Sequence, residues 1–156
     1  MVRLALLLLA LIGVRAVEVI ESDESFEQTV MASPDAWAVL FVSRTREENC
    51  AHAKSRFELV AETKADSYRF AIADVDDVKA FSSEFNVRKR MVPRLAVMNS
   101  RARLAEIVKL DAAAVTPADF EQAISEACAE NPRSSDGRVE KVTLAIGGGG
   151  EEKADL

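Results

Sequence analysis

The hydrophobic residues of this chain form short apolar runs that are separated by stretches with helical spacing. Residues 36–43 are apolar, β-branched and aromatic, which predicts a strand that is buried on both faces. In the charged loop that follows, Thr45 and Glu48 match the T-x-x-E pattern of a capping box, which predicts a helix start. The apolar residues of this helix lie on one stripe with a 3.6-residue period: Cys50, Ala53, Phe57, Val60 and Ala61.

The rest of the pattern predicts the element order β-α-β-α-β-α-β-β-α. Strands that are joined by helical crossovers are expected to be parallel, and the last two strands to form an antiparallel hairpin. The predicted fold class is therefore α/β, with a central mixed sheet and helices on both faces. The remaining predicted elements are strands at residues 17–20, 68–75, 94–98 and 104–110, and helices that begin after Ser22, near Val78 and after Thr116.

The two ends of the chain differ in composition from its middle. Residues 1–16 combine an early positive charge, a short apolar run and small residues at the end, which predicts a secretory signal peptide. A short membrane anchor or a core helix is the alternative. The apolar run is too short to span a bilayer, so no membrane span is expected after signal cleavage. Residues 17–131 form the predicted domain, and residues 132–156 a flexible polar and glycine-rich tail.

The charge and the histidine count exclude several classes of function. The 156 residues carry a formal net charge of −6, and removal of Arg3 and Arg15 with the signal peptide makes it −8. An acidic chain of this kind argues against nucleic acid as a partner. His52 is the only histidine, which leaves almost no basis for a zinc site or a catalytic triad. We expect neither a metal nor a cofactor, and we expect His52 on the helix surface.

This order of elements resembles the thioredoxin fold and, in detail, the protein disulfide isomerase family of the endoplasmic reticulum. The resemblance extends from Val17 to about residue 131. It implies a cis peptide bond before Pro93, at a position that faces the active-site loop in the family. The resemblance is carried by Val17-Glu18-Val19-Ile20, Ser25-Phe26-Glu27, residues 39–42, Phe57-Glu58-Leu59-Val60-Ala61, Ala73-Asp74-Val75-Asp76 and Val92-Pro93.

The chain departs from the family at the positions that carry its chemistry. The W-C-x-x-C motif of the family falls on residues 46–50, with Glu47 at the attacking-cysteine position and Cys50 at the resolving position. Phe41 stands where the active domains of the family have a buried carboxylate. The resemblance therefore implies a non-catalytic, redox-inactive domain that binds clients or partners.

The two cysteines are interpreted differently. Cys50 lies near a helix N-terminus, which lowers a thiol pKa, whereas burial and the neighbouring Glu47 and Glu48 raise it. An inert structural thiol is the favoured interpretation, and a redox role is the alternative. Cys128 lies on the apolar stripe of the last helix and is expected to fill the core. In the resembled topology the two cysteines lie too far apart for a disulfide.

Basic residues gather in two loops that the resembled fold places at one end of the sheet. They predict a basic binding face, to which Val92 and Pro93 contribute, and solvated loop charge is the alternative. These basic residues are Arg44, Arg46, Arg88, Lys89, Arg90 and Arg94.

The sequence thus predicts a redox-inactive, thioredoxin-like protein of the endoplasmic reticulum lumen. It would act in protein folding as a chaperone that binds unfolded or extended polypeptide clients, or associate with another member of the disulfide isomerase family. The alternative function is a single-cysteine thiol–disulfide oxidoreductase or isomerase that uses Cys50. The last four residues, Lys153-Ala154-Asp155-Leu156, resemble the K-D-E-L retention signal.

Overall fold

The computed structural model describes residues 15–98, 106–109 and 111–130, which form an α/β domain. Five strands make one mixed sheet in the order β1-β3-β2-β4-β5. The predicted pairing is confirmed, because β1, β3 and β2 are parallel while β4 and β5 run antiparallel to their neighbours. The strands are β1 Glu18–Ile20, β2 Trp37–Val42, β3 Arg69–Asp74, β4 Arg94–Met98 and β5 Glu106–Lys109.

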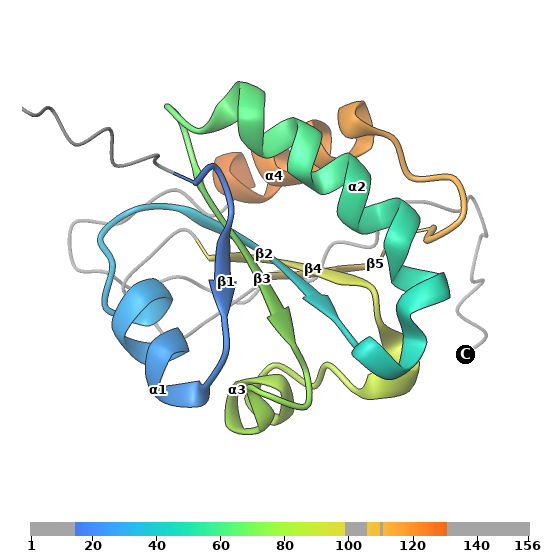
Figure 1. Ribbon diagram of the computed structural model, residues 1–156. Coiled ribbons are helices and arrows are strands. Elements are labelled where there is room, and N and C mark those ends of the chain that lie inside the picture. Colours follow the sequence, from blue (N-terminus) through green and yellow to red (C-terminus); the bar gives the residue numbers. More distant parts are fainter. Residues whose placement is uncertain (1–14, 99–105, 110, 131–156) are drawn as a thin grey trace, which may run out of the picture.

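Helices cover both faces of the sheet, as predicted: α2 and α4 lie on one face, and α1 and α3 on the other (Figure 1). A π-helical turn, Glu27–Met31, continues α1, and 3₁₀ turns at Arg44–Arg46 and Lys89–Met91 flank the central strands. The α-helices of the described residues are α1 Asp23–Phe26, α2 Glu47–Lys64, α3 Lys79–Glu84 and α4 Pro117–Glu130.

The central strand β2 is buried on both faces, which explains its continuous apolar sequence. Val39 and Phe41 face the core under α1 and α3, whereas Ala38 and Leu40 face the core under α2 and α4. All four side chains are fully buried. The strand therefore holds the two halves of the core together.

Phenylalanine rings fill the core under α1 and α3. The Phe26 ring lies 4.5 Å from that of Phe81 and 6.0 Å from that of Phe41. The Phe85 ring lies 6.3 Å from that of Phe41, so rings from two helices pack on the central strand. The other core uses a smaller group, in which Phe57 contacts Phe70 and Phe120.

Carboxylates fix the starts of two helices. Asp23 of α1 accepts backbone N–H groups of Ala80 and Phe81 at 3.0 and 3.1 Å, which joins α1 to the start of α3. The predicted cap of α4 is confirmed, because the Thr116 hydroxyl accepts the Asp119 N–H at 3.2 Å. Asp119 in turn accepts the Thr116 N–H and hydroxyl, and these hydrogen bonds lower the pKa of Asp119.

The predicted capping box at the start of α2 is wrong. Residues 44–46 form a separate 3₁₀ turn, so the helix begins at Glu47 after Arg46, whose φ and ψ are −129° and 36°. The Thr45 hydroxyl lies 2.9 Å from the Ser43 hydroxyl instead of capping the helix. The predicted apolar stripe of α2, from Cys50 to Ala61, is nevertheless buried.

Several sequence predictions fall outside the described residues. The signal peptide lies almost wholly in residues 1–14, and the tail lies in residues 132–156. The hairpin turn falls within residues 99–105. Among the described residues, no helix is long and apolar enough to cross a membrane.

Candidate functional site

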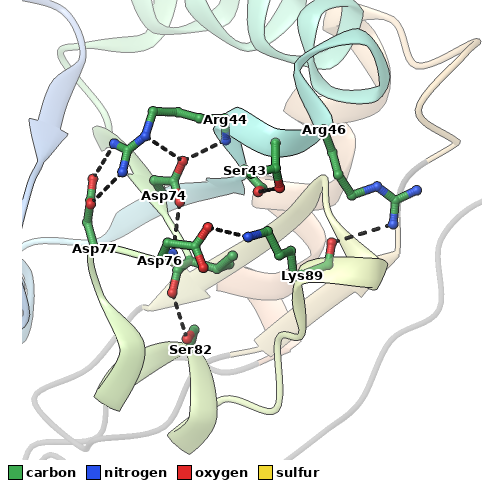
Figure 2. Close-up of polar contacts among 10 residues, drawn as sticks. Ser43, Arg44, Arg46, Asp74, Asp76, Asp77, Ser82 and Lys89 are labelled. Atoms are coloured by element: carbon green, nitrogen blue, oxygen red, sulfur yellow. Dashed lines mark hydrogen bonds and ion pairs between the residues drawn. The ribbon is translucent and has the colours of Figure 1, made fainter.

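The two loops that the sequence marks as functional lie side by side at one end of the sheet. The antiparallel register pairs Phe41 near the end of β2 with Arg94 at the start of β4. The loop after β2 therefore meets the segment that precedes β4. The Arg46 guanidinium joins them, since it donates to the carbonyl of Arg90 at 2.7 Å and more weakly to that of Lys89 at 3.5 Å (Figure 2).

The peptide bond between Val92 and Pro93 is cis, as the resemblance implied. Both side chains are buried, and Val92 belongs to the same core cluster as Cys50. The cis bond thus lies on the inner side of the candidate site. Any contact that a ligand makes here would involve the backbone more than these two side chains.

Cys50 is the fourth residue of α2, and its side chain is only 1% exposed. Burial raises the pKa of the Cys50 thiol, and the negative charge of Glu47 raises it further. A backbone hydrogen bond from Ser43 and the positive charge of Arg46 act in the opposite direction, but the pKa stays above its ordinary value. This shift favours the neutral form of the Cys50 thiol, and a neutral thiol is a weak nucleophile.

The second cysteine is remote from the first. Cys128 is half-buried on α4 and packs against the core under α2 and α4, whereas Cys50 belongs to the core on the opposite face. Both cysteines are free in the structure. The chain has two cysteines, so no further thiol can lie beside Cys50.

Two positions to which the resemblance assigns redox chemistry, that of the attacking cysteine and that of the buried carboxylate, hold other groups. Glu47 is the first residue of α2, and its carboxylate is exposed. Phe41 is fully buried, and its ring packs against those of Phe26 and Phe85. An aromatic ring accepts no proton, so this position offers no general base to a thiol above it.

Acidic residues after β3 neutralise part of the predicted basic face. The Arg44 guanidinium donates to both carboxylate oxygens of Asp77, at 2.7 and 2.8 Å (Figure 2). This pair raises the pKa of Arg44 and lowers that of Asp77. The buried carboxylate of Asp74 accepts the backbone N–H groups of Arg44 at 2.7 Å and of Asp76 at 2.8 Å.

Two of the six predicted cations remain exposed without an ion pair in the described part of the chain. Lys89 pairs with Asp76 at 2.6 Å, and Arg94 is half-buried, so that burial lowers its pKa. Arg88 and Arg90 are exposed, and neither has an ion-pair partner among the described residues. The surface is therefore mixed in charge rather than uniformly basic.

Sequence reasoning missed the acidic partners and the contact of His52. The sequence did signal the acidic partners, because Asp74 ends β3, and Asp76 and Asp77 follow it, where the carboxyl end of β3 lies beside that of β2. His52 was expected on the helix surface, but it is half-buried. Its Nε2 lies 2.9 Å from the carbonyl oxygen of Val115, which links α2 to the segment before α4.

The described residues contain no group of three or more histidine, cysteine, aspartate or glutamate side chains that could hold a metal ion. The chemistry that this end of the sheet offers consists of one buried thiol, exposed charges of both signs and backbone groups of two adjoining loops.

The sheet order, the helices on both faces and the cis proline beside the start of α2 define a thioredoxin-like fold. The thioredoxin of Malassezia sympodialis, Mala s 13, matches 71% of this chain and 90% of its own, with a TM-score of 0.55 and 21% identity. The J-Trx1 fragment of ERdj5 matches 73% of this chain with a TM-score of 0.55 and 16% identity. The match covers 51% of that fragment. No protein-family model and no curated protein matches the chain.

The raised pKa of Cys50 predicts a thiol that reacts slowly with alkylating agents at neutral pH. In a Cys128→Ser background, alkylation by iodoacetamide should be slow at pH 7 and should rise only above the ordinary thiol pKa of about 8.5. Glu47→Gln should shift this rise to lower pH, because it removes a negative charge that raises the pKa. The exposed Glu58→Gln, further along α2, is the control and should leave the profile unchanged. A rate that already levels off below pH 7 would contradict the prediction.

Proposed function

We propose that this protein is a non-catalytic thioredoxin-like domain of the protein disulfide isomerase type, and that it binds extended polypeptide segments in the lumen of the endoplasmic reticulum. The observation that carries the proposal is the state of Cys50. Its thiol is buried, its pKa is raised, and the other cysteine packs on the opposite face of the sheet.

Thiol–disulfide exchange has requirements that these residues do not meet. A thiolate must attack first, and a second thiol must then release the mixed disulfide. Glu47 stands at the aligned position of the attacking cysteine, and a carboxylate forms no bond to sulfur in this exchange. Phe41 supplies no proton acceptor in the core beneath.

The same end of the sheet has the properties of a binding surface. The Arg46 guanidinium donates a hydrogen bond of 2.7 Å to the carbonyl oxygen of Arg90. This bond links the two loops, so that they form one continuous surface. Exposed charges of both signs, on Glu47, Arg88 and Arg90, have no ion-pair partner within the described part of the chain. These charges are available to a bound polypeptide, where they would contribute to specificity and to the rate of association.

A single-cysteine oxidoreductase is the second candidate, and the position of Cys50 in the first turn of α2 favours it. Helix N–H groups and the backbone hydrogen bond from Ser43 favour a thiolate there. Such an enzyme would form a mixed disulfide between Cys50 and an oxidised glutathione or client disulfide, releasing the other sulfur as a thiol. A second thiol compound would then have to regenerate Cys50.

The exposed arginines should contribute to polypeptide binding. The double variant Arg88→Glu with Arg90→Glu should weaken binding of a labelled, unfolded polypeptide with carboxymethylated cysteines by about tenfold, and should flatten its salt dependence. Fluorescence anisotropy at several salt concentrations measures both effects. The charge-matched control, Lys64→Glu with Arg69→Glu, changes residues at the other end of the sheet and should have little effect. Equal losses in both variants would contradict a specific binding face.

Location in the endoplasmic reticulum is predicted from residues 1–16 and from the last four residues. Cell fractionation should find the chain in the lumen, cleaved near Val17. Deletion of residues 153–156 should increase secretion, because it removes a retention signal. Restoration of the full K-D-E-L by Ala154→Asp with Asp155→Glu is the control and should not increase it. An intact chain in the cytosol would refute this location.

A further inference from the structure

A cavity of about 330 Å³ lies beside the Lys89–Met91 turn, on the side that faces α3. Residues 75 and 76, which follow β3, the second half of α3 and residues 86–89 form its walls. Most of its lining is polar. The polar residues of the lining are Asp76, Ser82, Ser83, Asn86, Arg88 and Lys89.

The charges of the cavity do not balance. Lys89 and Asp76 pair with each other at 2.6 Å and cancel (Figure 2). Arg88 is exposed and has no ion pair within the described residues. One positive charge therefore remains, on a planar guanidinium that can donate two parallel hydrogen bonds to a carboxylate.

Two further donors are available in the lining. Ser82 is occupied, because its hydroxyl lies 3.4 Å from the carbonyl oxygen of Val75 and 3.2 Å from that of Lys79. Ser83 and Asn86 are exposed, and the described contacts give neither side chain a hydrogen-bond partner. The Ser83 hydroxyl and the Asn86 amide, which line the same cavity as Arg88, can therefore donate hydrogen bonds to a ligand.

The cavity adjoins the candidate binding surface through a single residue. Lys89 is one of the residues that line the cavity, and its carbonyl oxygen lies 3.5 Å from the Arg46 guanidinium. An extended polypeptide advances about 3.3 Å per residue. A chain that lies along the two loops would therefore pass this turn within a few residues.

We propose that this cavity receives an acidic side chain, aspartate or glutamate, of the bound polypeptide. The inference rests on the proposed function and adds a sequence preference to it. Arg88 would pair with the carboxylate, and Ser83 and Asn86 would donate to it. A lysine or arginine of the client would instead meet the positive charge of Arg88, and an apolar side chain would leave the polar lining without partners.

Matched peptides test the preference directly. A labelled, unstructured host peptide carries one glutamate at successive positions, and each version is compared with its glutamine counterpart. At the position that reaches the cavity, the wild type should bind the glutamate peptide about fivefold more tightly. Arg88→Gln should abolish this ratio, because it removes the charge that pairs with the glutamate, whereas Arg90→Gln should preserve the ratio. Ser83→Asp places a competing carboxylate in the cavity and should also abolish it.

The outcomes separate this inference from the proposed function. If the wild type binds none of the peptides, the proposed function fails and the inference fails with it. If the peptides bind but no position shows a glutamate preference, or if Arg90→Gln removes the preference and Arg88→Gln does not, the inference alone is overturned. Circular dichroism of the variants checks that their folds are intact. If Arg88→Gln is misfolded, Ser83→Asp decides the question, and an unchanged ratio in that variant refutes the inference.

Discussion

The burial of β2 on both faces is the constraint on which the rest of this structure depends. Because Val39 and Phe41 pack under α1 and α3 while Ala38 and Leu40 pack under α2 and α4, the strand cannot shift without disrupting both cores. This rigid strand ends at the loop that leads into α2, and so it sets the position of Cys50. The same burial decides the chemistry, since a carboxylate at position 41 would have to displace an aromatic ring from a close-packed cluster.

Electrostatics at the end of the sheet follows from the parallel pairing of β2 with β3. The carboxyl ends of these strands lie together, so Asp74 and Asp77 meet Arg44, which follows β2. The acidic residues anchor this loop and compensate its charge. The outer group of charges, on Glu47, Arg88 and Arg90, has no ion-pair partner among the described residues. The site is thus organised as an anchored inner layer with a mixed-charge outer layer.

Most of the fold could be predicted from the sequence, because the strands stand out as continuous apolar runs and the helices carry apolar residues at helical spacing. The strand and helix order, the parallel pairing and the burial of Cys50 all follow from that pattern. The local sequence could not show that the capping box is absent. Thr45 and Glu48 match the motif, but a 3₁₀ turn at residues 44–46 delays the start of the helix. The pairing of Arg44 with Asp77 joins residues that are remote in sequence, and only the register of β2 and β3 brings them together.

Turnover of a disulfide substrate is the measurement that tests the account most directly. Insulin reduction is compared among the wild type, Glu47→Cys and Cys50→Ser. We expect no turnover above background for the wild type or for Cys50→Ser. We expect a measurable but modest gain for Glu47→Cys, because this variant creates a C-x-x-C at the start of α2 while Phe41 still supplies no proton acceptor. Robust wild-type turnover that Cys50→Ser abolishes would contradict the account and identify Cys50 as a catalytic thiol.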